Sequence, residues 1–108
     1  MWDVNLSPTL GAEIQKARPC VVVSSDQVGI LPLKVVVPIT GWQDQFEGYS
    51  SFVKLEPDVQ NGLDKLSAAD AFQIRSLSVE RFIMQRGILS AEQVADIVAA
   101  VGIVIQIF

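Results

Sequence analysis

Two kinds of apolar pattern mark the strands of this chain. Residues 2–6 (Trp-Asp-Val-Asn-Leu) and residues 51–55 alternate apolar and polar side chains, which is the period of a half-buried strand. Residues 20–23 and 34–39 are instead apolar at consecutive positions and rich in valine, which is typical of strands covered on both faces. The pattern predicts these two apolar runs to be adjacent core strands.

Segments without a period separate the strands. Pro8 ends the first strand because proline cannot donate to a sheet ladder, and residues 7–18 read as a long loop. Further turns or loops are expected at residues 24–27, 41–48 and 56–64. Residues 69–77 and 82–88 are predicted to be short strands, joined by one helical turn at residues 78–81.

The C-terminal segment is predicted to be a helix over residues 90–106. Ser90 and Gln93 form a capping-box signature, and Glu92 places a carboxylate in the first turn. Apolar residues then recur at helical spacing at Val94, Ile97, Val98 and Val101. The expected fold is mainly β (α+β), with five to seven short strands closed or nearly closed into a small barrel and one helix across it, as one domain over residues 1–108.

Composition narrows the class of protein. A chain of 108 residues, half of them hydrophobic, can bury one core without covalent staples. No apolar run is long enough to span a membrane, and the start lacks the pattern of a secretory signal, so we expect a cytoplasmic protein without a membrane partner. The one cysteine, Cys20, lies in an apolar run and is expected to be a buried thiol, which excludes disulfides.

Histidine is absent, which removes the commonest general base and the commonest metal ligand. Carboxylate pairs such as Asp70 with Glu80, or Glu56 with Asp58, are weak candidates for a metal site, so no metal or cofactor is expected. The net charge of −4 has the wrong sign for binding nucleic acid over the whole surface. An RNA site would have to be a local basic groove or belong to an assembly of chains.

The first candidate residues lie at strand ends. Residues 11–19 place Glu13, Lys16 and Arg18 before a core strand, and the planar guanidinium of Arg18 suits bidentate phosphate binding. A solvated arginine flanking a strand explains the same sequence. Thr40 follows a core strand and could hold a hydroxyl on a rigid element, or it could simply end the strand before Gly41.

Two further candidates are aromatic or polar. Trp42 is either a core aromatic at a loop edge or a platform for a stacked base, and the former is favoured. Alternation in residues 72–76 sends Gln73 and Arg75 to one side of a predicted strand, where the amide could read a base and the cation could contact phosphate. A solvent face explains that spacing equally well.

Read in order, several segments resemble the MazF/PemK family of toxin endoribonucleases. They are residues 2–13 (WDVNLSPTLGAE), 18–24 (RPCVVVS), 35–40 (VVVPIT), 73–77 (QIRSL) and 87–90 (GILS). The resemblance covers nearly the whole chain and implies a small SH3-like or CcdB-like β-barrel. It also implies a toxin of a type II toxin–antitoxin system that cleaves single-stranded RNA without a metal. In the implied reaction the neighbouring 2′ hydroxyl is the nucleophile, and the products carry a 2′,3′-cyclic phosphate and a 5′ hydroxyl.

The resemblance also assigns roles by position. Arg18 matches the family's catalytic arginine and Thr40 its catalytic threonine, whereas Glu13, Gln73 and Arg75 fall where the family contacts RNA or supports the site. Lys16 is expected to join the cationic groove. A homodimer, a cognate antitoxin with an acidic tail and a DNA-binding complex with that antitoxin are the implied assemblies.

Departures from the family pattern leave other functions open. Ala12 stands where many members have Ser or His, and Asp70 and Phe72 occupy places where some carry a cation and an acid that touch RNA. One alternative is a non-enzymatic CcdB-like toxin that binds DNA gyrase, although the chain lacks the C-terminal tryptophan of such poisons. Another is a catalytically degenerate relative that only binds a partner.

Overall fold

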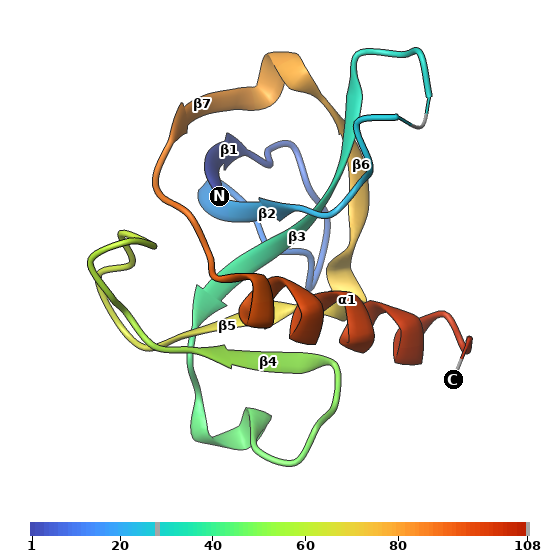
Figure 1. Ribbon diagram of the computed structural model, residues 1–108. Coiled ribbons are helices and arrows are strands. Elements are labelled where there is room, and N and C mark those ends of the chain that lie inside the picture. Colours follow the sequence, from blue (N-terminus) through green and yellow to red (C-terminus); the bar gives the residue numbers. More distant parts are fainter. Residues whose placement is uncertain (28, 108) are drawn as a thin grey trace.

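The computed structural model describes residues 1–27 and 29–107 as a β-sheet crossed by one helix (Figure 1). Its strands are β1 (Trp2–Asn5), β2 (Ala17–Val22), β3 (Leu33–Gly41), β4 (Phe52–Leu55), β5 (Ser67–Asp70), β6 (Arg75–Ser78) and β7 (Phe82–Gln85). The helices are three 3₁₀ turns, η1 (Asp44–Phe46), η2 (Ala71–Gln73) and η3 (Val79–Arg81), and α1 (Ala91–Val104). The number of strands agrees with the sequence prediction.

Strand β3 is the centre of the sheet. The antiparallel order is β4-β5-β3-β2-β1-β7, and β6 also pairs with β3. β3 can serve three partners because it is nine residues long: its first half pairs with β6, its middle with β2 and its last residues with β5. The sheet curls but does not close, so the expected barrel is open rather than complete.

The two valine-rich strands are adjacent and buried on both faces, as predicted. On one face Val21, Val37 and Ile39 join a core cluster that includes Ile97 of α1. On the other face Cys20 and Val36 pack with residues of β1 and with the loop that follows it. Consecutive apolar residues are required here because each strand supplies alternate side chains to two different cores.

The prediction of a single strand over residues 69–77 was wrong. Ile39 pairs with Ala69 on β5, whereas Val36 pairs with Arg75 on β6. Three residues along β3 therefore correspond to six residues along the segment that pairs with it. The three extra residues form η2, whose first residue, Ala71, is buried.

The helix begins as predicted and ends two residues earlier. Ser90 accepts a hydrogen bond from the Gln93 N–H while the Gln93 side chain accepts one from the Ser90 N–H, completing the capping box. At the other end Gln106 has a φ of 66°, and the Ile107 N–H donates to the carbonyl of Gly102 at 3.0 Å. This six-to-one bond around a left-handed residue ends a helix as a Schellman motif.

One further boundary differs from the prediction in a way that bears on the site. β2 begins at Ala17, so the loop after β1 is shorter than predicted and Arg18 lies inside a strand. Residues 78–81 form the expected helical turn, with Ser78 as its N-cap. Within residues 1–27 and 29–107, no helix has the length and apolar character needed to cross a membrane.

The buried thiol of Cys20 yields a reactivity prediction. Cys20 is fully buried, and desolvation raises the pKa of its thiol to about 12 despite the positive charge of Arg75. At pH 8 the native protein should therefore react with a thiol reagent such as DTNB only as fast as it unfolds, because the thiolate is the nucleophile. Full labelling of the native state within the time needed to label the denatured protein would contradict this burial.

Candidate functional site

Arg18 and Thr40 are brought together by the register of β2 and β3. Cys20 pairs with Pro38, so the next position on the same face of each strand is Arg18 on β2 and Thr40 on β3. The ladder between the two strands ends at Cys20 and Pro38. Beyond that point the strands part, and both predicted catalytic residues line a hollow of about 190 Å³.

Beside the hollow, β2 and β3 each pair with a further strand. Arg18 pairs with Val4 of β1, and Thr40 pairs with Ala68 of β5. Val4 and Ala68 are fully buried. The two functional side chains therefore project from backbone that the core fixes on either side, which is what a preorganised site requires.

The guanidinium of Arg18 is half-buried and available to bind an anion. Its Nε donates to the carbonyl of Gln15 at 3.2 Å, which orients the side chain. Within residues 1–27 and 29–107, no carboxylate lies within 4.0 Å of it. The Nη groups can therefore bind an incoming phosphate in the bidentate manner that suits a guanidinium.

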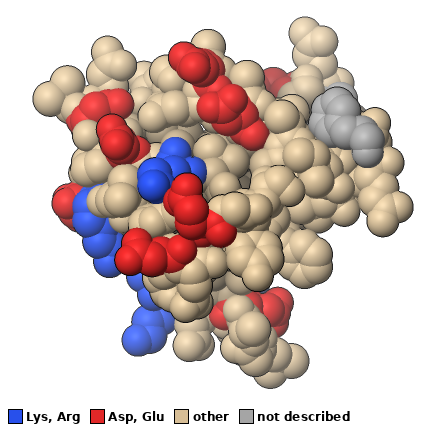
Figure 2. Space-filling model, turned by 90° about the horizontal axis from the view of Figure 1, so that it is seen from below, with Lys and Arg blue, Asp and Glu red and all other residues tan. Residues whose placement is uncertain are grey.

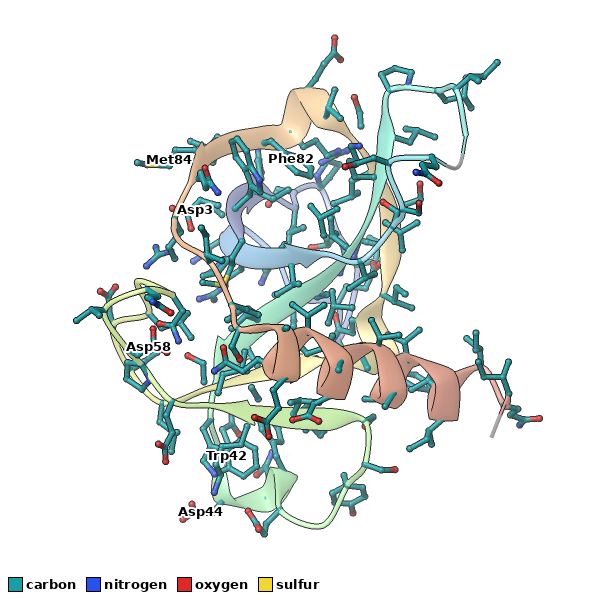
Figure 3. All side chains as sticks on the ribbon, viewed as in Figure 1. Asp3, Trp42, Asp44, Asp58, Phe82 and Met84 are labelled. Atoms are coloured by element: carbon teal, nitrogen blue, oxygen red, sulfur yellow. The ribbon has the colours of Figure 1, made fainter. Side chains whose placement is uncertain are left out.

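Two further cations line the same hollow, Lys65 before β5 and Arg86 after β7. Arg86 is neutralised by Asp3, whose carboxylate lies 2.8 Å from Nε, and by Asp64 at 3.5 Å from Nη1. The hydrogen bond that Arg86 donates to the Asp3 carboxylate is the main reason that the pKa of Arg86 is raised. Figure 3 shows Asp3 on the side of the molecule where the loop carrying Asp58 lies. Arg86 therefore lines the hollow with its charge already paired with two carboxylates.

The loop between β4 and β5 is built around a buried asparagine. The Asn61 side-chain oxygen accepts hydrogen bonds from the N–H groups of Asp58 at 3.1 Å and Leu63 at 2.9 Å, and its amide donates to the carbonyl of Glu56 at 2.9 Å. Gly62, with a φ of 67°, lies so close to Arg86 that a Cβ would stand 2.7 Å from its carbonyl oxygen. These contacts fix the backbone before residues 63–65, which line the hollow.

Three of the predicted RNA-contacting residues lie together at a second hollow, apart from Arg18 and Thr40. Glu13, Gln73 and Arg75 line a second hollow, of about 400 Å³, with Ala12, Phe72 and Ile74. Gln73 lies in η2 and Arg75 begins β6, so the two do not share a strand as predicted, yet the Arg75 Nη2 lies 3.4 Å from the Gln73 Oε1. Phe72 is 74% exposed beside them.

Gln73 ties the loop after β1 to η2. Its Oε1 accepts from the Ile14 N–H at 2.6 Å, and its Nε2 donates to Asp70 Oδ2 at 3.1 Å. Burial raises the pKa of Asp70, although hydrogen bonds from Phe72 and Gln73 oppose the shift. The amide of Gln73 therefore shapes the edge of the second hollow through internal bonds.

Glu13 and Lys16 belong to the same loop. Glu13 Oε1 accepts from the Leu10 N–H at 2.6 Å, closing a turn. Lys16 has a φ of 68° and directly precedes β2, with an exposed side chain that lines neither hollow. Arg81 holds the start of the loop by donating to the carbonyls of Asn5 at 3.2 Å and Ser7 at 2.6 Å.

Trp42 is half-buried at the edge of the loop after β3, and neither of the two core clusters of the described residues includes it. Figure 3 shows it between β4 and η1. Its ring meets Phe46 edge-on at 5.7 Å between centroids, and Lys54 Nζ lies 4.4 Å from its centroid. Lys54 also pairs with Glu47 at 3.5 Å. These contacts hold the loop after β3 against β4.

Charge is unevenly distributed over the surface. Figure 2 shows Lys and Arg side chains on one side of the face it draws, with Asp and Glu among them, whereas the side toward the C-terminal end of α1 is almost uncharged. Exposed apolar residues of that end include Val98, Ile103, Ile105 and Ile107. In the described residues, no cluster of three or more His, Cys, Asp or Glu could hold a metal ion.

Sequence reasoning missed Lys65 and Arg86. No motif joins them to Arg18 and Thr40, because their approach depends on the pairing of β3 with β5 and on the contact of residue 86 with the loop after β4. The one available signal was the charged Asp64-Lys65 pair between a Gly turn and a strand. That pattern by itself is also typical of a solvated loop.

A small antiparallel sheet with one C-terminal helix, and a cationic hollow beside a strand threonine, define a candidate phosphate-binding site. The profile of the family described as PemK-like, MazF-like toxin of type II toxin-antitoxin system matches residues 1–105. The chain therefore belongs to this toxin family. The recognition made from sequence motifs is confirmed.

Individual relatives agree with this assignment. The chain is 32% identical over 103 residues to endoribonuclease MazF9 of Mycobacterium tuberculosis, covering 90% of this chain and 85% of that protein. It is similar in structure to MazF from Deinococcus radiodurans, with a TM-score of 0.79 at 25% identity, over 98% of this chain and 92% of that one. For the M. tuberculosis toxin MazF-mt6 the TM-score is 0.77 at 23% identity, over 99% and 96%. The expected fold class is thereby confirmed.

Proposed function

We propose that this toxin is an endoribonuclease that cleaves single-stranded RNA at the hollow between β2 and β3, without a metal. The observation that carries the proposal is the convergence of Arg18 and Thr40 in one hollow, on a chain whose relative is an endoribonuclease. The reaction consumes only RNA. The 2′ oxygen bonds to phosphorus, the bond from phosphorus to the 5′ oxygen breaks, the 2′ proton leaves and the 5′ oxygen gains a proton.

Arg18 has the leading role in this mechanism. Negative charge builds up on the phosphate as the 2′ oxygen attacks, and a guanidinium whose Nη groups have no hydrogen-bond partner among residues 1–27 and 29–107 stabilises the transition state more than the ground state. Arg18 acts by its charge, because a guanidinium hardly loses its proton near neutral pH. Thr40 holds the phosphate oxygens by its hydroxyl, in a geometry fixed by β3.

The second hollow suits the flanking RNA. Arg75 supplies a cation there, and Glu13 and Gln73 shape the loop around it. Lys16, exposed at the end of the same loop, adds charge for the RNA backbone. These four residues form the proposed RNA-binding set, and the exposed ring of Phe72 can stack on a base.

Assembly and partners follow from the family. One structural relative is described as an endoribonuclease in complex with its cognate antitoxin from a mycobacterial species, with a TM-score of 0.73 at 15% identity, over 99% of this chain and 91% of that one. We infer that this chain binds a cognate antitoxin, in the cytoplasm and as a homodimer. The nearly uncharged side at the end of α1 supports pairing, and a second protomer supplies more cations to an acidic chain.

Cleavage in EDTA tests the proposal. The purified chain is incubated with a long single-stranded RNA and the ends of the products are mapped. We expect discrete cuts within a short sequence, with cyclic phosphate and 5′ hydroxyl ends, because no step requires a metal. A preparation of Arg18→Ala made in parallel reports any contaminating nuclease. RNA that stays intact would favour a catalytically degenerate relative or a gyrase-binding toxin, and a DNA gyrase assay then separates these two.

A further inference from the structure

Lys65 lies across the backbone that follows Thr40. A Cβ built on Gly41 would stand 3.1 Å from both Nζ and Cε of Lys65, so the end of the lysine side chain would have to shift by a few tenths of an ångström to admit a side chain at position 41. The glycine therefore brings an ammonium group next to the predicted catalytic threonine. Both residues line the hollow that also holds Arg18.

The backbone of this lysine is fixed against β3. The Ser67 hydroxyl donates to the carbonyl of Lys65 at 2.8 Å, and the Trp42 N–H donates to the carbonyl of Leu66 at 3.0 Å. Gly41 itself pairs with Ser67 in the ladder between β3 and β5. Lys65 thus enters the hollow from a position that the sheet determines.

The charge of Lys65 is not neutralised by its neighbours. Asp64, the adjacent residue, pairs with Arg86 at 3.5 Å, and its side chain is otherwise 90% exposed. In the part of the chain that the structure describes, no carboxylate lies within 4.0 Å of Lys65 Nζ. Of the three cations around the hollow, Arg86 is held by carboxylates, whereas Arg18 and Lys65 remain open to an anion.

We propose that Lys65 is a further catalytic residue, which contacts the reacting phosphate opposite Arg18 and is held there by Gly41. The inference rests on the proposed function and deepens it. Two cations from opposite sides would neutralise the charge that develops on the phosphate during attack by the 2′ oxygen. Lysine suits this position because its ammonium acts as a compact point charge, whereas the fork of Arg18 fixes the geometry.

Single-turnover cleavage with saturating enzyme tests the role of Lys65. Lys65→Met keeps much of the apolar stem, and we expect it to lower the rate constant for bound RNA by about tenfold to a hundredfold, the value of one charge-assisted contact. Lys54→Met is the matched control. It also removes one lysine charge, but from the outer loop beside Trp42, and it should leave the rate constant within about twofold.

Gly41→Ala is an independent test of the role of Lys65, because it shifts the ammonium group without removing it. Only the flexible end of Lys65 stands near the new Cβ, so the fold should be kept, and a melting curve of each variant verifies this. Gly41→Ala should slow cleavage in the wild-type background and have no further effect in the Lys65→Met background, because one interaction is lost only once.

The outcomes separate the inference from the function on which it rests. If the wild type and Lys54→Met cleave RNA and folded Lys65→Met does so at the same rate, the role of Lys65 is wrong and the proposed function stands. The same conclusion follows if Gly41→Ala causes an equal loss in both backgrounds. If the wild type itself leaves the RNA intact, the proposed function has failed first.

Discussion

Arg18→Ala is expected to reduce RNA cleavage by at least about two orders of magnitude, which corresponds to roughly 2.7 kcal/mol of transition-state stabilisation. The physical reason is the loss of a half-buried guanidinium that lines the hollow and has no carboxylate within 4.0 Å among the described residues. The fold should persist, because among the described residues the side chain makes its one hydrogen bond to the nearby carbonyl of Gln15. Initial cleavage rates and a melting curve measure the two effects.

Two variants control this result. Arg18→Lys keeps the charge and removes the planar fork, so it should fall between the wild type and Arg18→Ala. Lys34→Ala removes a cation from the opposite end of β3, where Asp26 already pairs with it at 3.1 Å, and should cleave normally. A folded Arg18→Ala protein that cleaves at the wild-type rate would refute the assignment.

Ile97→Ala is expected to destabilise the protein by about 3 kcal/mol, since truncating a buried isoleucine removes apolar contacts and leaves a cavity. Ile97 is fully buried and belongs to the core cluster that joins α1 to β2 and β3. Such a loss is a large part of the stability of a domain of this size. Chemical denaturation at a fixed protein concentration, to keep any association constant, measures the change.

Ile103→Ala is the matched comparison for this prediction. It makes the same chemical change in the same helix, at a position that is 47% exposed instead of buried. Its cost should stay below about 1 kcal/mol, because most of the removed surface already contacts water. Equal destabilisation by the two variants would show that the packing of α1 on the sheet is not as described.

The parts of the fold that could be predicted are those in which local pattern and tertiary role agree. The valine runs of β2 and β3 indicated burial on two faces, and Ser90 with Gln93 located the start of α1. Residues 69–77 were mistaken for one strand, because alternation carries no sign of a change in register. The three extra residues of η2 are required only by the way β5 and β6 share β3.

The candidate site likewise contains residues that motifs could indicate and residues that only tertiary contacts reveal. Arg18 and Thr40 could be identified from motifs, and the register of their strands then places them in one hollow. Gln73 was expected on the same strand as Arg75 but lies in η2, and its internal hydrogen bonds depend on a loop that no pattern describes. Lys65 was missed because its approach to Gly41 is a contact across the sheet.

The central claim is that this toxin cuts RNA by attack of a 2′ hydroxyl in the hollow of Arg18 and Thr40. Once the cut site is mapped, a short RNA carrying one 2′-deoxynucleotide immediately before the cut bond tests it directly, with the unmodified RNA as reference. We expect the modified strand to stay intact while it still competes for binding. Cleavage of the modified strand at the same bond would contradict this mechanism, because the nucleophile could not then be the 2′ hydroxyl.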